Sequence, residues 1–172
     1  MKAFQIFKHD KTNLHVQQVE IPRPQLQPHE LLIEVKASGV NPLDNMIIRG
    51  DVRMITPYSF PLTLGNECSG VVVEVGSTVQ DFAVGDKVFS RLPTDQIGAF
   101  ADYVAVAKMP EGLTFTEAAS IPLTALTASQ ALELMGAKAG DTIFISGGSG
   151  GLGAMAIPLA KSRGLTVYTN GN

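Results

Sequence analysis

Several residue types are scarce in this 172-residue chain, and each scarcity excludes a class of protein. The single cysteine, Cys68, cannot form an internal disulfide, which favours a reducing compartment. No apolar run approaches the roughly 18 residues that a membrane-spanning helix needs. The residues after Met1 form no signal-peptide pattern. We therefore expect a cytoplasmic protein without a membrane partner.

Charge is also scarce, at 17% of residues, and the formal net charge is only −3. Such a balance provides no general polyanion-binding surface, so nucleic acid is not expected as a partner. The end of the chain differs from the rest, because residues 137–172 hold three basic residues (Lys138, Lys161 and Arg163) and one acidic residue, Asp141. This local excess fits either a phosphate site or a solvated surface.

The first two thirds of the chain consist of short β-like runs separated by proline and glycine. With 45% hydrophobic residues, the chain can bury a substantial core. The runs cover residues 3–7, 14–21, 31–37, 70–76, 86–89 and 102–107. Strands at this spacing predict an antiparallel barrel or sandwich.

The pattern changes after Pro110. Thr114 and Glu117 have the spacing of a capping box, so a helix should begin near Phe115. We expect Pro122 to interrupt this helix, which resumes over 123–135 and ends at Gly136. A strand over 142–146, a glycine loop over 147–151, a helix to about Arg163 and a strand over 165–169 follow. These elements form one βαβ unit.

Parallel sheets are normally wider than two strands. We therefore expect the chain to be a truncated portion of a longer protein, with the remaining strands of a nucleotide-binding sheet beyond Asn172. The predicted fold class is α/β with a β-rich domain. Residues 1–120 should form the β domain and residues 121–172 the start of the nucleotide-binding domain.

The glycine loop carries the clearest chemical signal. Gly148, Gly150 and Gly153 have the G-x-G-x-x-G spacing after an apolar strand and before a helix, and Gly151 and Leu152 lie between them. In this context the backbone can approach a pyrophosphate, and the first N–H groups of the helix face its negative charge. The loop therefore predicts dinucleotide binding, although a glycine-rich loop packed closely on a sheet gives the same pattern.

The residues at the end of the second strand of this unit, about 20 positions after the glycine loop, indicate which dinucleotide binds. NAD-binding members of such folds usually place an acidic residue there, which binds the ribose 2′-hydroxyl and repels a 2′-phosphate. Here the chain reads Tyr168, Thr169, Asn170, with no acid. We therefore expect NADPH as the cofactor and Asn170 as a cofactor-binding residue.

At this point the chain resembles the medium-chain dehydrogenase/reductase superfamily, and specifically its zinc-free quinone oxidoreductase-like branch, over essentially its whole length. The segments that carry the resemblance are SGVNPLD at 38–44, FPLTLGNECSGVVVEVG at 60–76, GDKVF at 85–89, GAFADYVAV at 98–106, IPLTALTASQAL at 121–132 and the glycine loop. The resemblance implies a GroES-like β-barrel, a Rossmann domain and hydride transfer from a nicotinamide to a quinone or a conjugated carbonyl. It also implies further Rossmann strands and a return segment, which we expect outside this chain.

Zinc-dependent members of this superfamily hold a catalytic zinc with two cysteines and a histidine, and use a hydroxyl to relay protons. The matching positions in this chain are Asn41, Asn66, Leu123 and Leu43 by resemblance. None of these side chains is a good zinc ligand or proton relay. Cys68 is alone, and His9, His15 and His29 have no partner at ligand spacing. No metal is therefore expected, and hydrogen bonds must polarise the carbonyl.

Two residues are candidates for that task. Asn41 resembles the family's cleft asparagine, which could contact the substrate oxygen or the nicotinamide ribose, but it could also be a turn residue before Pro42. Thr127 resembles the family threonine beside the nicotinamide, but its hydroxyl could instead bond back to a helix carbonyl. Glu67 follows Asn66 where zinc-dependent members have a His-Glu pair, and with no metal to serve it is expected to be structural rather than catalytic. Met46 takes the place of a tyrosine that some relatives carry, so the site should be more apolar.

Three functions remain in competition. The leading one is an NADPH-dependent quinone or enone reductase, expected to be a homodimer when complete, of which these 172 residues alone should be inactive. The second is an enoyl-thioester reductase of the same superfamily. The third is a non-catalytic GroES-like module that binds a partner through exposed sheet edges.

Overall fold

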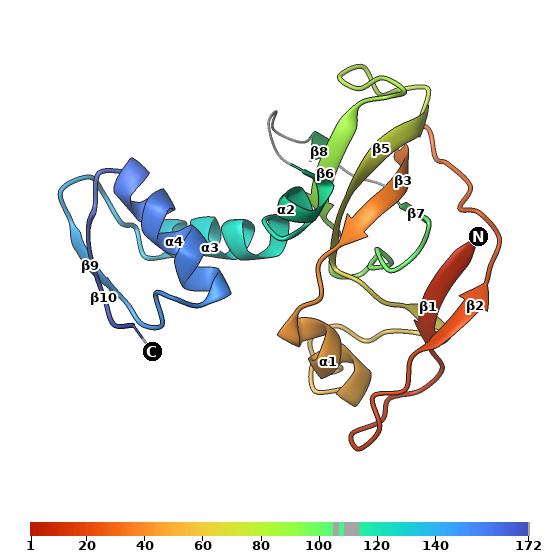
Figure 1. The fold of residues 1–172 in the computed structure, drawn as a ribbon, viewed down its shortest axis with the longest axis horizontal. Coiled ribbons are helices and arrows are strands. Elements are labelled where there is room, and N and C mark those ends of the chain that lie inside the picture. Colours follow the sequence, from red (N-terminus) through yellow and green to blue (C-terminus); the bar gives the residue numbers. More distant parts are fainter. Residues whose placement is uncertain (105–106, 109–113, 172) are drawn as a thin grey trace. The chain divides into compact units, whose positions relative to one another are not determined.

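The computed structural model describes residues 1–104, 107–108 and 114–171. The chain divides into two compact units, Met1–Ser120 and Ile121–Asn172 (Figure 1). The first unit is built mainly of strands, and the second combines helices with a small sheet. The predicted strand at 102–107 lies partly outside the described residues.

Two antiparallel sheets form the first unit. The larger has five strands in the order β7-β3-β5-β6-β8, and the smaller has three in the order β2-β1-β4. Their bounds are β1 (Lys2–Ile6), β2 (Gln17–Glu20), β3 (Leu31–Ser38), β4 (Leu62–Thr63), β5 (Glu67–Val75), β6 (Lys87–Arg91), β7 (Tyr103–Val104) and β8 (Ala107–Lys108). The predicted antiparallel β domain is confirmed.

Alternation along the strands supplies the core of this unit, because successive side chains point to opposite faces of a sheet. Leu31 and Ile33 of β3 pack with Val72 of β5 and Val88 of β6 in one buried cluster. The register of β3 against β5 places Ser38 opposite Cys68, at the end of the pairing that faces the functional residues. This register decides which residues meet beyond the two strands.

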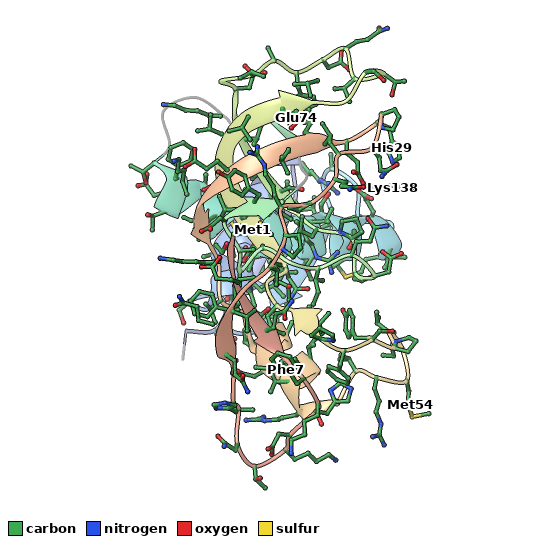
Figure 2. All side chains as sticks on the ribbon, turned by 90° about the vertical axis from the view of Figure 1, so that its right-hand side faces the viewer. Met1, Phe7, His29, Met54, Glu74 and Lys138 are labelled. Carbon is green, nitrogen blue, oxygen red and sulfur yellow. The ribbon has the colours of Figure 1, made fainter. Side chains whose placement is uncertain are left out.

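The segment after β3 forms a helix that the sequence analysis did not predict. α1 (Pro42–Arg49) has Asn41 as N-cap and Pro42 in its first turn, and it ends at Gly50 in the left-handed region, with φ of +76°. Ile47 and Ile48 anchor its inner face in a second core cluster with Ile6 and Leu64. In the loop that follows, Met54 projects into solvent (Figure 2).

A short helix, α2 (Phe115–Ala119), closes the first unit and confirms the predicted capping box. The backbone N–H of Glu117 donates to Thr114 Oγ1 at 3.2 Å, and the N–H of Thr114 donates to Glu117 Oε2 at 2.9 Å. The predicted interruption at Pro122 is confirmed, because α2 ends at Ala119 and a second helix, α3 (Pro122–Leu134), begins at this proline. Proline is tolerated there because the first helical N–H groups have no intrahelical partner.

The second unit is the predicted βαβ unit, preceded by α3. Strands β9 (Thr142–Ile145) and β10 (Thr166–Thr169) are parallel, and α4 (Gly151–Ser162) connects them. Ile143 and Val167 pack against Leu132 of α3 and Ala160 of α4. On the opposite face, the register partners Phe144 and Tyr168 are exposed. In the part of the chain that the structure describes, no helix is long and apolar enough to span a membrane.

Candidate functional site

The predicted site residue Asn41 lies where β3 leads into α1, next to the first residue of β5. Its side-chain Nδ2 donates to Glu67 Oε1 at 2.6 Å. Asn41 is half-buried, whereas Glu67 is only 2% exposed. Asn41 is therefore neither a simple turn residue nor a free amide, because it caps α1 and is held by a buried carboxylate.

A second amide and carboxylate pair lies beside the first. Asp44 accepts hydrogen bonds from the Asn41 backbone N–H and from Asn66 Nδ2, both at 2.7 Å. Both Asp44 and Asn66 are almost fully buried, and Asn66 Oδ1 has no hydrogen-bond partner among the described residues. Burial raises the pKa of the Asp44 carboxyl, and the hydrogen bonds from Asn41 and Asn66 partly oppose this rise.

The residues at the positions that correspond to zinc ligands carry amide and apolar side chains. Asn41 and Asn66 present amides, and Leu43 packs against the core of the first unit. Leu123 belongs to α3 in the second unit. Among the described residues, no group of three histidine, cysteine or acidic side chains could hold a metal ion. Burial also raises the pKa of the Cys68 thiol to about 12, which disfavours the thiolate that a metal requires.

The aromatic and apolar residues near α1 have separate roles. Tyr58, which sequence reasoning could not place, donates its hydroxyl to the Thr94 carbonyl at 2.7 Å. Met46, at the position where some relatives carry a tyrosine, is 41% exposed on α1. Neither side chain joins the hydrogen bonds of Asn41, Asp44, Asn66 and Glu67, which we name the amide–carboxylate cluster.

Two glycines are required by packing, one in the loop before α4 and one in the first turn of α4. A Cβ on Gly148 would overlap the Thr169 side chain. A Cβ on Gly153 would lie 2.5 Å from the Gly148 Cα and 2.6 Å from the Gly147 carbonyl oxygen. Real Cβ atoms do not approach other atoms this closely, so both positions need glycine whether or not a ligand binds.

Two other glycines of the same loop have no such packing reason. A Cβ on Gly151 would meet only Thr124 Cγ2, at 4.0 Å, and a Cβ on Gly150 would meet only the Gly147 carbonyl oxygen, at 3.3 Å. Gly150 has a φ of −77°, which any residue adopts. The space beside Gly151 is therefore open, whereas a Cβ on Gly150 would be tight against the Gly147 carbonyl oxygen.

The helix that begins at this loop is uncapped. No side chain accepts a hydrogen bond at the N-terminus of α4, and its first turn has no acidic residue. The N–H groups of Gly151, Leu152 and Gly153 thus have no intrahelical acceptor. Such a terminus carries partial positive charge and attracts an anion.

The two remaining predicted residues make local hydrogen bonds. Asn170 Oδ1 accepts the Gly147 N–H at 2.9 Å, and the Gly148 N–H donates to the Asn170 carbonyl at 3.2 Å. Thr127 is exposed on α3 and donates its hydroxyl to the Leu123 carbonyl at 2.7 Å. Asn170 therefore fixes the glycine loop, and the Thr127 hydroxyl retains only its acceptor capacity.

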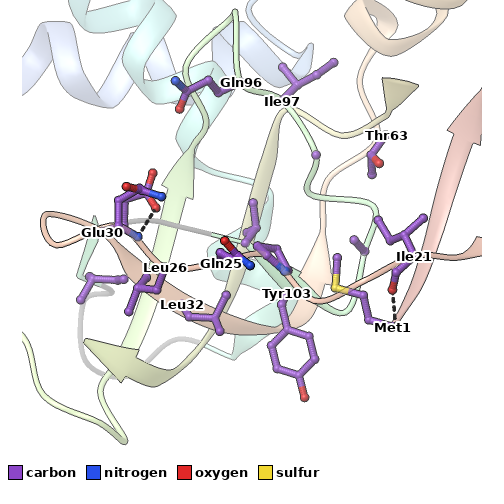
Figure 3. Close-up of a pocket in the computed structure, with 16 residues that line it drawn as sticks. Met1, Ile21, Gln25, Leu26, Glu30, Leu32, Thr63, Gln96, Ile97 and Tyr103 are labelled. Carbon is purple, nitrogen blue, oxygen red and sulfur yellow. Dashed lines mark hydrogen bonds between the residues drawn. The ribbon is translucent and has the colours of Figure 1, made fainter. Parts of the chain in front are cut away.

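A pocket in the second unit is lined by predicted cofactor-binding residues, whereas a pocket in the first unit is not. In the second unit, Gly150, Gly151, Leu152 and Gly153 line a pocket of about 660 Å³ together with β9 and α3. In the first unit, a pocket of about 440 Å³ lies beside Met1, whose amino group donates to the Ile21 carbonyl (Figure 3). That pocket contains none of the predicted site residues.

The raised pKa of Asp44 generates a prediction. The folded protein should hold the Asp44 proton more tightly than the unfolded chain does, so this carboxyl stabilises the fold most below its unfolded pKa. That contribution should be lost as the pH rises through the folded pKa. Carbon NMR titration of the Asp44 carboxyl should show a pKa above the ordinary aspartate value of about 3.9. A pKa at or below that value would contradict the burial argument.

The chain is similar to known proteins in both sequence and fold. Residues 27–111 match the family described as the alcohol dehydrogenase GroES-like domain. The chain is 38% identical over 155 residues to the chloroplastic quinone-oxidoreductase homolog of Spinacia oleracea, a match that covers 83% of this chain and 47% of the relative.

Solved structures agree with the sequence match. The quinone oxidoreductase of Coxiella burnetii superposes with a TM-score of 0.86 at 36% identity, over 98% of this chain and 56% of that one. The quinone oxidoreductase of Escherichia coli complexed with NADPH gives a TM-score of 0.82 at 27% identity, over 98% of this chain and 52% of that one. The chain spans about half the length of the relatives that it matches. Its fold, the family match and these relatives show that the chain belongs to the medium-chain dehydrogenase/reductase superfamily, in its quinone oxidoreductase-like branch.

Proposed function

We propose that this chain provides the GroES-like domain and the first dinucleotide-binding elements of a zinc-free, NADPH-dependent reductase of quinones or α,β-unsaturated carbonyls. The observation that carries the proposal is the open space at Gly151 beside an uncapped helix terminus. Packing explains Gly148 and Gly153 and restricts Gly150, but it does not explain Gly151. A pyrophosphate in contact with the backbone would explain a glycine at that position.

NADPH is favoured over NADH by the residues at the end of β10 and just after it. Tyr168, Thr169 and Asn170 place no carboxylate where a 2′-phosphate would lie in such a fold. The E. coli relative, whose structure contains NADPH, supports a nicotinamide cofactor. In the proposed assignment, Gly148, Gly150, Gly151, Leu152, Gly153 and Asn170 form or shape the cofactor site.

The mechanism proposed for the chain uses neutral polar groups. When bound, NADPH supplies the hydride. Asn41, half-buried at the start of α1, offers an amide to the substrate or to the nicotinamide ribose, and Thr127 offers its hydroxyl oxygen as an acceptor. The carboxyl groups of Asp44 and Glu67 are buried and accept hydrogen bonds from amides. In this proposal neither carboxyl group supplies the proton that the reduced substrate takes up.

The absence of zinc remains part of the proposal. It is supported by the amides of Asn41 and Asn66, since amides are poor zinc ligands. Without a Lewis acid, a conjugated acceptor is favoured, because its β-carbon takes the hydride while the developing charge spreads to oxygen. A simple ketone or alcohol would be a poorer substrate.

Several features of the whole protein stay predictions. Because the relatives are about twice as long, we propose that residues outside these 172 complete the cofactor and substrate sites and that this chain alone transfers no hydride. A homodimer is still expected for the complete protein. The cytoplasm also stays a prediction, since the spinach relative is chloroplastic.

The glycine loop provides the direct test of cofactor binding. In the complete gene product, Gly151→Val should leave thermal unfolding nearly unchanged, because its side chain enters open space. The same change should raise the NADPH dissociation constant at least about tenfold, or about 1.4 kcal/mol. Titration calorimetry and thermal unfolding measure the two effects.

Gly148→Ala is the matched control for this test. Its Cβ would overlap Thr169, so it should lower stability even without NADPH. If Gly151→Val left NADPH affinity intact, the phosphate-binding role of the loop would have to be abandoned. Loss of stability in Gly151→Val would instead show that the space beside Gly151 is not open.

Cofactor preference is tested by Asn170→Asp. An aspartate oxygen can still accept the Gly147 N–H, so the loop should keep its shape. The new charge should weaken NADPH binding by roughly 1–3 kcal/mol through repulsion of the 2′-phosphate, and NADH binding should change little. An equal loss for both cofactors would mean that the loop itself had been damaged.

A further inference from the structure

We propose that Glu67 is a positioning residue: it fixes the carboxamide of Asn41 for the reaction and does not itself contact substrate or cofactor. This inference rests on the proposed function, in which Asn41 touches one of the reacting molecules. Sequence analysis treated Glu67 as structural, because no metal was expected for it to serve. The geometry assigns it a specific task.

The first observation is the hydrogen bond between the two residues. Asn41 Nδ2 lies 2.6 Å from Glu67 Oε1, which is a short contact for an amide and a carboxylate. A carboxylate can only accept hydrogen bonds, so it selects the nitrogen of the amide and rejects its oxygen. Glu67 therefore holds the nitrogen of the Asn41 carboxamide, and the capping box of α1 places the same side chain against the Asp44 backbone N–H.

The second observation is the close passage of the chain over Glu67. A Cβ on Gly39 would overlap Glu67 Oε1 and would lie 2.8 Å from the Ala119 carbonyl oxygen. The oxygen that accepts from Asn41 is thus the same atom that lies against Gly39. Only glycine at this position lets the segment between β3 and α1 pass close enough for the hydrogen bond to form.

The third observation is that the backbone of Asn41 is fixed independently of Glu67. Ser38 donates its hydroxyl to the Ala99 carbonyl at 2.6 Å, and Asp44 accepts the Asn41 N–H at 2.7 Å. These contacts hold the main chain before and after the side chain of interest. Glu67 adds an acceptor for the side-chain amide nitrogen of Asn41, and this contact orients the carboxamide.

A purely structural role explains the carboxylate less well. Moving a charged group into a protein interior costs several kcal/mol before hydrogen bonds offset part of it, and apolar replacements of buried charges are often neutral or stabilising. Glu67 is 2% exposed and begins a strand in which Cys68 and Val72 are apolar and fully buried. Holding the Asn41 amide is a task that accounts for a carboxylate at this buried position.

The test is a double-mutant cycle in the complete gene product, with steady-state kinetics for NADPH and a quinone. Asn41→Ala and Glu67→Ala should each lower kcat/KM by up to about a hundredfold, the order of magnitude expected for a group misplaced by about 1 Å. The double variant should be no worse than Asn41→Ala alone. Glu67→Gln, whose carbonyl oxygen can accept the same bond, should recover most of the activity. Independent, additive losses, or full activity in a folded Glu67→Ala, would overturn the proposal.

A second measurement covers variants that fail to fold and separates this inference from the proposed function. In proton–nitrogen NMR, one Asn41 side-chain amide proton should be shifted downfield by the carboxylate, and Glu67→Gln should move this signal. An Asn41 signal that is identical in both proteins would overturn the positioning role even if Glu67→Ala did not fold. If the unaltered protein oxidised no NADPH with any acceptor, the proposed function would fail. The shift in the Asn41 signal would then still decide whether Glu67 orients the amide.

Discussion

The register of β3 against β5 is the constraint on which the first unit depends. Because Ser38 pairs with Cys68, the residues just beyond the pairing, Asn41 and Glu67, come within hydrogen-bond distance. Helix α1 starts at that contact, and its third residue, Asp44, reaches back to the Asn41 N–H. A shift of the register by one residue would move Glu67 to the other face of the sheet and remove the contact.

In the second unit the corresponding constraint is the close approach of the glycine loop to α4 and β10. Gly153 lies against Gly148, and Gly148 lies against Thr169, so the loop cannot move away from the helix terminus. Asn170 closes the loop from the other side through the Gly147 N–H. Packing therefore fixes the position of Gly150 and Gly151 and leaves the outer side of Gly151 free.

Much of this arrangement could be predicted from the sequence, because it follows from local patterns. The βαβ unit and the Thr114 capping box depend on neighbouring residues, and both are confirmed. Helix α1 also had local signals in Asn41, Pro42, Asp44 and Gly50, but the sequence analysis offered only a turn at Asn41 as the alternative to a cleft residue and predicted no helix there. The bond between Asn41 and Glu67 could not be predicted, because it joins residues 26 positions apart through a strand register. The division of the glycines into packed and open positions likewise required three-dimensional contacts.

The central claim is that amides held by buried carboxylates occupy the place of a metal centre in an NADPH-dependent reductase. The most direct measurement is NADPH oxidation by the complete gene product with a quinone acceptor, before and after exhaustive chelation, with elemental analysis of the same samples. The account predicts turnover at the same rate in both samples and no stoichiometric zinc in either. Activity that disappeared on chelation and returned with added Zn²⁺ would contradict it.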